Sequence, residues 1–466
     1  MRRRARSWLR WSIAIWDEGT GQRTVGVMTP LFFVTLREKR SWQERLLLIL
    51  AAAFVALNGI ALSLALTGAL SLQHLAAPTV WLATMVAAHL LLQRLQPQHD
   101  PVLLPLYALL TGWGLILIDR LAPNFLWRQL LWLVLGTALL VVLAVVPQSL
   151  RLVRRYRYTW LTIGLVLLVA TLVFGVNPSG SGAALWLPWP FLDDVYFQPS
   201  ELLKLLLVIF LASYFDEYQR VATVSPDGGS RRHLAYLAPL FLMWGFSILL
   251  LVWQRDLGAA ALFFLVFLAL LYLATGQWQY VAGGIGLLAL AALFGYFTFA
   301  VVELRFETWW NPWPEAMDRA FQIVQSLYAI AAGGVTGQGV GQGFPYYVPV
   351  VHSDFAFAAI AEEWGLVGSI ATIACFALLA HRGLFIASRA RRAFHMYLAV
   401  GMTLLISVQA FLIMAGVARL IPLTGVTLPL VSYGGSSLLM TSAMLGLLLN
   451  LSSRMELGQR RLRRKR

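Results

Sequence analysis

Two long apolar runs surround one short charged turn in FLMWGFSILLLVWQRDLGAAALFFLVFLALLYLA, residues 241–274. An apolar run of about twenty residues is long enough to cross the ~30 Å hydrocarbon core of a bilayer. Both runs are continuous, whereas the strands of a membrane barrel alternate polar and apolar residues. The stretch therefore predicts two membrane-spanning helices joined at Arg255 and Asp256, and with them an all-α polytopic membrane protein.

The composition of the whole chain supports this fold class. Of its 466 residues, 59% are hydrophobic and 12% are charged, whereas a soluble chain carries about 25% charged residues. The apolar runs of sufficient length predict twelve membrane spans. We place them near residues 45–67, 78–95, 101–121, 128–147, 158–176, 199–216, 234–253, 258–274, 279–302, 356–381, 395–416 and 427–450.

Positive charge is concentrated at the chain ends and in a few short loops. The net charge is +15, and arginines cluster in residues 1–6, 151–157, 388–392 and 460–466. Basic residues favour the cytoplasmic side of a membrane, and an even number of spans puts both termini on one side. We therefore expect both termini in the cytoplasm and Asp256 at the outer face. This distribution also argues against a nucleic-acid partner.

The longest predicted outer loop, residues 303–355, is unusually apolar. It contains a helical pattern, AFQIVQSLYAIAAGG at 320–334, followed by a glycine-rich stretch. Irregular backbone at membrane depth is tolerated where it lines a cavity. We expect this loop to be partly re-entrant, folded back into the membrane face.

Several common catalytic signatures are absent from the sequence. It has no P-loop, no G-x-S-x-G and no His-rich zinc motif, which argues against the classes that need them. Cys375 is the only cysteine, so one chain forms neither a disulfide nor a cysteine-based metal site. The candidates for chemistry are therefore charged residues in and beside the spans.

Asp256 has two compatible interpretations. Aspartate is a favoured N-cap, so it is expected to cap the helix that begins near Leu257, with Arg255 neutralising its charge. A low-dielectric boundary can also raise the pKa of a carboxylate towards the range that suits a general base. A capping aspartate keeps one oxygen for that chemistry.

Glu201 and Lys204 share one helical face in QPSELLKL, residues 198–205. Pro199 and Ser200 indicate the start of this helix, with Ser200 as its expected N-cap. Charges within a span are costly and face a cavity or each other. The two residues form either a structural ion pair that joins helices or a phosphate contact in which Glu201 orients Lys204.

Further polar groups lie in and beside the last three spans. Asp354 is expected to cap the helix that begins near Phe355. Glu362 and Glu363 fall within that span and require an aqueous cavity or a polar partner, such as Arg419. Residues 419–437 contain two prolines and three glycines, and such broken backbone at membrane depth lines a cavity or a binding site.

Five motifs, in this order, resemble the SEDS family, the polytopic proteins of shape, elongation, division and sporulation. They are QPSELLKL, QRDLGAA at 254–260, FQIVQSLYAIAAGGVTGQGVGQG at 321–343, VPVVHSDFAFAAIAEEWGLVG at 348–368, and IPLTGVTLPLVSYGGSS at 421–437. Each alone is moderately specific, and the complete ordered set is highly specific. The match extends over about residues 101–451.

The resemblance implies a domain organisation and an activity. It implies a ten-helix core in 101–451, two added N-terminal helices in 45–100, a basic cytoplasmic segment 1–44 and a basic cytoplasmic tail 452–466. Members of the family polymerise lipid II, a disaccharide-pentapeptide on undecaprenyl pyrophosphate, into peptidoglycan at the bacterial cytoplasmic membrane. They work with a class B penicillin-binding protein transpeptidase and with other elongation or division complex proteins.

The resemblance also implies roles for particular residues. Asp256 matches the acidic residue regarded as catalytic. The residues that we expect to contact the substrate are Glu201, Lys204, Trp186, Arg255, Gln322, Ser353, Asp354, Glu362 and Ser432. A divalent cation, Mg²⁺ or Mn²⁺, is a possible cofactor without assigned ligands.

One departure from the family pattern concerns the presumed catalytic turn. Arg255 replaces the usual proline before the aspartate, which alters the turn and puts a cation beside the base. Two other functions use the same charges and remain open: a lipid II flippase, and a non-catalytic scaffold for the penicillin-binding protein.

Overall fold

The structure is a computed structural model that describes residues 30–146, 149–177, 183–188, 195–224 and 243–463. Helices dominate it: α1 (Pro30–Thr67), α2 (Leu72–Leu95), α3 (Leu103–Leu121), α4 (Pro123–Val145), α5 (Ser149–Arg155), α6 (Arg157–Phe174), α7 (Pro199–Val224), the helix Met243–Trp253, α9 (Leu257–Thr275), α10 (Trp278–Thr298), α11 (Ala300–Trp310), α12 (Phe321–Gly333), α13 (Ala356–Ser388), α14 (Ala393–Val417) and α15 (Gly435–Arg463). Two-residue strands β1 (Leu187–Pro188) and β2 (Tyr196–Phe197) pair in antiparallel.

Ten helices of the described chain are long and apolar enough to cross a membrane, which confirms the predicted all-α polytopic membrane protein. They are α1, α2, α3, α4, α6, α9, α10, α13, α14 and α15. The predicted span 199–216 lies within α7, a continuous helix of 26 residues. The predicted span 234–253 is described from residue 243 only, as the 11-residue helix Met243–Trp253.

Two predicted helix boundaries are wrong in informative ways. The last helix begins at Gly435 and not at 427, because residues 418–434 hold prolines and a left-handed Gly425, with φ of 70°. The span predicted at 356–381 is the longer α13, which kinks at Gly365, where φ is 65° and ψ is −159°.

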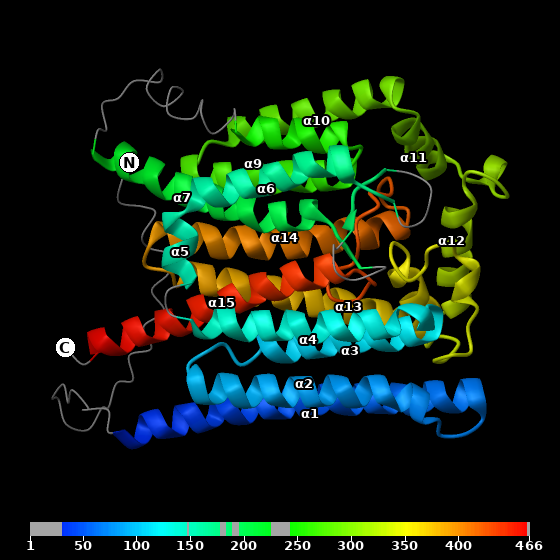
Figure 1. Cartoon of the computed structure of the whole chain (residues 1–466), viewed down its shortest axis with the longest axis horizontal. Helices are drawn as coiled ribbons and strands as arrows, with labels where there is room; N and C mark the ends of the chain where they lie inside the picture. The colour runs from blue at the N-terminus through cyan, green and yellow to red at the C-terminus, as the bar shows by residue number, and fades with distance from the viewer. Residues whose placement is uncertain (1–29, 147–148, 178–182, 189–194, 225–242, 464–466) are drawn as a thin grey trace, which may run out of the picture.

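The spans lie side by side, with α1 and α2 as a hairpin along one edge of the bundle (Figure 1). The bundle has two chemically different ends. We call the end where α1 begins and α15 finishes the basic end; α5 also lies there. The other we call the loop end, because α11, α12 and residues 334–355 and 418–434 gather there.

The large loop folds back onto the loop end. In Figure 1, α12 crosses the ends of the other helices, and it packs against α13. After α12, the backbone N–H groups of Gln338 and Gly339 donate to the carbonyl oxygens of Glu362 and Glu363 at 2.9 and 3.0 Å. The loop therefore turns back as predicted, although α12 lies across the helix ends.

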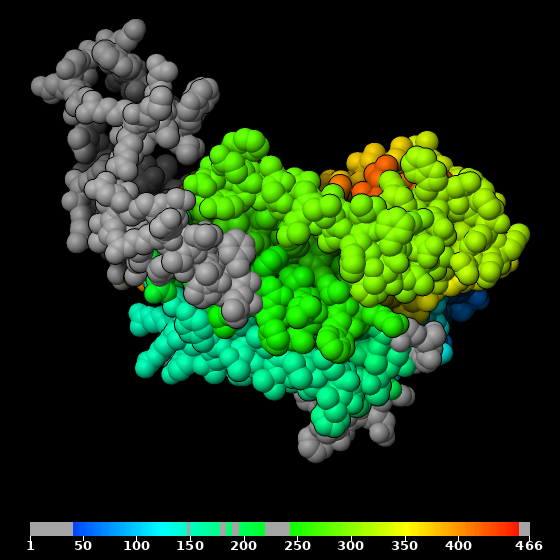
Figure 2. All heavy atoms as spheres, turned by 90° about the horizontal axis from the view of Figure 1, so that it is seen from above, coloured from blue at the N-terminus to red at the C-terminus, as the bar shows by residue number. Residues whose placement is uncertain are grey.

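The helices α6 and α10 form an apolar outer face, whereas most side chains of α9 are buried. Most side chains of α10 are exposed within the chain, and this helix packs against α9 and α11. Figure 2 shows this face hollowed between α10 and α11 on one side and residues near 250 on the other. Such exposed apolar surface is what lipid covers in a membrane protein.

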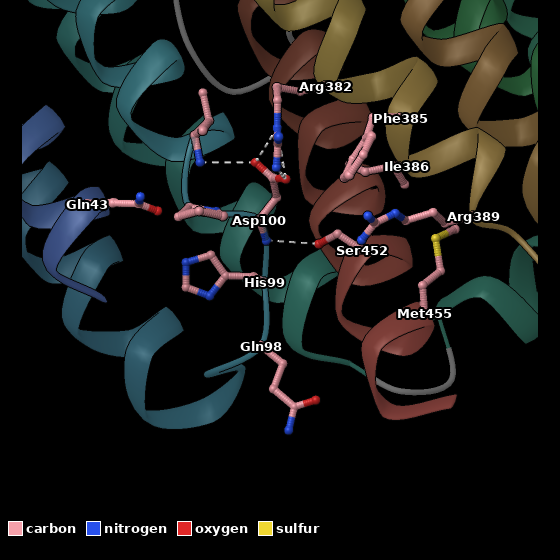
Figure 3. Close-up of a pocket in the computed structure, with 12 residues that line it drawn as sticks. Gln43, Gln98, His99, Asp100, Arg382, Phe385, Ile386, Arg389, Ser452 and Met455 are labelled. Atoms are coloured by element: carbon pink, nitrogen blue, oxygen red, sulfur yellow. Dashed lines mark hydrogen bonds and ion pairs between the residues drawn. The ribbon is translucent and has the colours of Figure 1, made fainter. Parts of the chain in front are cut away.

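Buried ion pairs join the N-terminal hairpin to the rest of the bundle. Asp100, just before α3, accepts hydrogen bonds from Arg382 of α13, with Nε 3.1 Å from Oδ2, and its backbone N–H donates to Ser452 of α15 (Figure 3). Beside this contact, the Oε2 of Glu44 lies 2.9 Å from the Nε2 of His99. These pairs satisfy polar groups that would be costly in an apolar bundle.

Candidate active site

Asp256 occupies the N-cap position of α9 at the loop end, as predicted. Its Oδ1 accepts the backbone N–H of Ala259 at 3.1 Å. Its Oδ2 is buried and has no hydrogen-bond partner within the described residues. An unpaired buried acceptor costs about 1–3 kcal/mol of stability. Capping therefore explains the position of Oδ1 and leaves Oδ2 without a structural role.

The turn that presents Asp256 depends on a strained Arg255. Arg255 has φ of 62°, in the left-handed region, and its N–H donates to the carbonyl oxygen of Val252 at 3.0 Å. Proline requires φ near about −65°, so this turn differs in shape from one that contains proline. The Arg255 side chain is exposed, and none of the ion pairs of the described chain joins it to Asp256. The expectation that it neutralises Asp256 is therefore wrong.

The cation that faces Asp256 is Arg305, which sequence reasoning missed. Arg305 lies on α11, and its Nη1 donates to the carbonyl oxygen of Thr424 at 3.2 Å. Burial lowers the pKa of Arg305, whereas the negative charges of Asp354 and Asp256 act to raise it. Its only sequence signal was its place between Glu303 and Glu307 in the outer loop.

Asp354 is the second carboxylate of this cluster. Its Oδ1 accepts the Ser353 hydroxyl at 2.7 Å. Burial raises the pKa of Asp354, against the opposing effects of Ser353 and Arg305. The prediction that Asp354 caps α13 is wrong, because Phe355 occupies the cap position and makes no side-chain cap bond. Its carboxylate is directed instead to Ser353 and Arg305.

The broken segment 418–434 holds the cluster together. The Ser432 hydroxyl donates to the carbonyl oxygen of Ser353 and accepts the backbone N–H of Leu428. Gly425 lies so close to Arg305 that a Cβ there would be 2.9 Å from its Nη2. The segment therefore contacts both Arg305 and Ser353, and its role as the lining of a binding site stays a prediction.

Glu201 and Lys204 form a buried ion pair, the first of the two arrangements that the sequence predicts. The Nζ of Lys204 lies 2.7 Å from Glu201 Oε1 and 3.0 Å from Gln409 Oε1, which joins α7 to α14. Gln409 in turn donates to the carbonyl oxygen of Thr427 at 2.8 Å. The pair therefore reaches the same segment 418–434 that contacts Arg305. Ser200 lies inside the helix, which begins at Pro199, and is not its N-cap.

Glu362 and Glu363 belong to a neighbouring cluster. Glu362 Oε1 accepts the backbone N–H of Phe344 at 2.7 Å. Glu363 Oε1 lies 3.4 Å from the Nε of Arg120, whose Nη2 donates to Gly343. The prediction that Arg419 is the partner of these glutamates is wrong, since Arg419 donates to the carbonyl oxygens of Trp309 and Trp310.

Two further predicted residues are not joined to the Asp256 cluster by any hydrogen bond in the described chain. Trp186 is half-buried, and its backbone forms a bridge with Val176 beside β1. Gln322 is exposed near the start of α12.

The arrangement assigns no ligands to the expected divalent cation. Within the described ranges, no three His, Cys, Asp or Glu side chains are grouped so that they could hold a metal ion. The two carboxylates of the cluster, Asp256 and Asp354, instead face the positive charge of Arg305. The guanidinium of Arg305 interacts electrostatically with both carboxylates and supplies positive charge to the cluster.

These features define a class: a multi-pass helical membrane protein with a polar cluster at one end of its bundle. The family model described as "Cell cycle protein", which covers FtsW, RodA and SpoVE, matches residues 102–457. The chain belongs to this family, as its motifs predicted.

Curated relatives and solved structures cover most of the chain. Peptidoglycan glycosyltransferase RodA of Mycobacterium bovis is 37% identical over 383 residues, 78% of this chain and 80% of the relative. The probable peptidoglycan glycosyltransferase FtsW of Geobacter sulfurreducens is 33% identical over 77% of this chain and 96% of its own length.

Two solved structures share the fold. One is a peptidoglycan synthase complex, described as coordinating polymerization and crosslinking. It is 28% identical, covers 77% of this chain and 98% of the other, and has a TM-score of 0.63. The other, the rod shape determining protein RodA of Thermus thermophilus, is 28% identical, covers 76% and 97%, and has a TM-score of 0.55.

Proposed function

We propose that this protein is a peptidoglycan glycosyltransferase that polymerises lipid II, with Asp256 as its general base. The observation that carries the proposal is the buried, unpaired Oδ2 of Asp256 beside Arg305. The curated relatives bear the names of peptidoglycan glycosyltransferases. A base must accept a proton through a free oxygen, and this carboxylate has one.

The loop end is proposed to face the outside of the bacterial cytoplasmic membrane, with both termini in the cytoplasm. The arginines of residues 151–157 and 388–392 gather at the basic end (Figure 1). An excess of arginine in short loops marks the cytoplasmic side. Asp256 then lies where the sugars of an exported lipid-linked substrate are found.

The proposed reaction begins with proton transfer to Asp256. Its Oδ2 takes the proton of the 4-hydroxyl of the acceptor's N-acetylglucosamine. The freed oxygen attacks the anomeric carbon of the donor's muramoyl unit, and the bond to the pyrophosphate breaks with inversion. The electron pair of that bond leaves with undecaprenyl pyrophosphate. A positioned carboxylate base contributes about 10²–10⁴-fold to such a step.

Arg305 and Asp354 are proposed to set the electrostatics of this step. The positive charge of Arg305 interacts electrostatically with the carboxylate of Asp256. The same guanidinium is a suitable donor to the developing charge of the leaving pyrophosphate. Asp354 and the carbonyl oxygen of Thr424 keep Arg305 in place.

A class B penicillin-binding protein is the proposed partner, along with other elongation or division complex proteins. The solved peptidoglycan synthase complex that shares this fold supports the proposal. Mg²⁺ or Mn²⁺ also stays a proposal, and chelation by EDTA tests it: a requirement predicts loss of polymer that returns when the ion is restored.

The deciding experiment is a gel assay of glycan polymer made from lipid II. Purified full-length protein is assayed with its penicillin-binding partner and moenomycin, as wild type and as Asp256→Asn. The matched control is Asp318→Asn, which removes an exposed aspartate of the outer loop 303–355. We expect moenomycin-resistant polymer from wild type and control only. Polymer from Asp256→Asn would refute the base assignment. No polymer from folded wild type would favour a flippase or a scaffold. Measuring lipid II transport across vesicle membranes then distinguishes these two functions.

A further inference from the structure

A strongly cationic cavity lies at the basic end of the bundle, opposite the Asp256 site. Its volume is about 750 Å³, and α5, α6, α7, α14 and α15 contribute to its lining. Six of the residues that line it are arginines, namely Arg151, Arg154, Arg155, Arg157, Arg392 and Arg454. This concentration of like charge in one cavity requires an explanation, because like charges repel strongly near a low-dielectric interior.

Two of these arginines are neutralised by carboxylates of α7. Arg154 Nη2 lies 2.6 Å from Asp216 Oδ2, and Arg157 Nη2 lies 2.5 Å from Glu217 Oε2. Arg157 also donates to the Ser213 hydroxyl at 2.9 Å. These two arginines therefore have a structural role that ties α5 and α6 to α7.

Three of the other arginines, Arg151, Arg155 and Arg392, leave an excess of positive charge in the cavity. No carboxylate of the described chain forms an ion pair with Arg151, Arg155 or Arg392. Arg454 donates to the side-chain oxygen of Asn450 at 2.7 Å. The charges of Arg151 and Arg392 repel that of Arg454. An anion placed among these groups would relieve that repulsion.

Exposed aromatic residues beside the cavity indicate that it lies near the membrane surface. Tyr156, Tyr158 and Trp160 are 42%, 47% and 36% exposed, and they follow α5 directly. Tyrosine and tryptophan mark the interface between hydrocarbon and water. Leu152 on α5 is also exposed, at 46%, which suits contact with acyl chains.

We propose that this cavity binds the phosphate headgroup of an anionic phospholipid, with Arg151 and Arg392 as its principal contacts. Basic pockets between membrane helices on the cytoplasmic side suit such headgroups. The adjoining aromatic belt favours a lipid over a dissolved phosphate. This site is separate from the transferase chemistry and does not rest on it.

The test measures lipid binding by the full-length protein in detergent, using native mass spectrometry. Phosphatidylglycerol is titrated, with phosphatidylcholine and sodium pyrophosphate as the comparison ligands. The variant Arg151→Gln/Arg392→Gln removes the two proposed contacts. The control Arg94→Gln/Arg389→Gln removes the same charge from exposed arginines of the basic end that do not line this cavity. Thermal unfolding establishes that both variants are folded.

We expect wild type and control to bind phosphatidylglycerol in preference to phosphatidylcholine. The cavity variant should lose roughly fivefold in affinity for each arginine removed, which is the effect of one basic residue at a membrane surface. Equal binding by the cavity variant and the control would overturn the site. Displacement of the lipid by equimolar pyrophosphate would overturn the lipid as its occupant and assign a dissolved phosphate instead.

Discussion

Arg305 donates from its Nη1 to the carbonyl oxygen of Thr424, 3.2 Å away. This bond ties α11 to the broken segment 418–434 and holds a guanidinium beside two carboxylates, Asp256 and Asp354. The relationship unites three parts of the chain that are far apart in sequence.

Replacing Arg305 by glutamine should impair catalysis through the base. Loss of a preorganised charged donor typically costs about 10²–10³-fold in kcat. Initial polymerisation rates measure this loss, and thermal unfolding establishes that the variant is folded. Arg319→Gln, at an exposed arginine of the same loop, should keep the wild-type rate. A wild-type rate for Arg305→Gln would contradict a role for its charge in the reaction.

Gly425→Ala should be more damaging than its backbone angle alone explains. Gly425 has φ of 70°, and a Cβ would lie 2.9 Å from Arg305 Nη2. Gly276 has φ of 69° with open space around it, so Gly276→Ala reports the backbone cost alone, about 1–2 kcal/mol. Thermal unfolding and polymer yield compare the two variants. Equal loss of activity in both would mean that the contact with Arg305 is unimportant.

Lys204→Met should destabilise the fold by about 3–5 kcal/mol, because it leaves Glu201 buried and unpaired. The double change Glu201→Gln/Lys204→Met removes both charges and should recover much of that stability. Chemical denaturation in detergent measures stability, and the gel assay measures activity. Recovery of both properties identifies a structural pair. Recovery of stability without activity identifies a phosphate contact by Lys204.

His99 should make the stability of the N-terminal hairpin depend on pH. Burial acts to lower the pKa of His99, but the bonds to Glu44 and the Gln96 carbonyl raise it overall above 6.5. The stabilisation is therefore complete below pH 6.5 and is lost as the pH rises through the folded-state pKa. Between pH 6 and 9, the midpoint temperature of thermal unfolding should fall more steeply for wild type than for His99→Gln. The control is His381→Gln, at an exposed histidine, and it should follow the wild-type profile. An equally flat profile for wild type and His99→Gln would contradict the linkage between His99 and stability.

The spans could be predicted because they are local properties of the chain. A run of about twenty apolar residues in lipid must satisfy its own backbone hydrogen bonds, and a helix does this within the run. Asp256 could be predicted as a cap for the same reason, since its partner, the Ala259 N–H, is three residues away. The role of Asp256 as a general base was then predicted from its match to the family motif.

The partners of buried charges could not be predicted. Glu363 pairs with Arg120, 243 residues away in the chain, and nothing local distinguishes Arg120 from the expected Arg419. Arg305 could not be predicted as a site residue, because its role depends on Asp256 and Asp354, which are distant from it in the sequence.

Apolar run length, charge distribution and short-range capping thus determine which segments span the membrane, which end is basic and where α9 begins, because each acts within one segment. Packing alone decides that Arg305 faces Asp256 and Asp354, that Lys204 bridges α7 and α14, and that six arginines enclose one cavity. These contacts depend on the relative placement of helices, which the burial of all their surfaces fixes together.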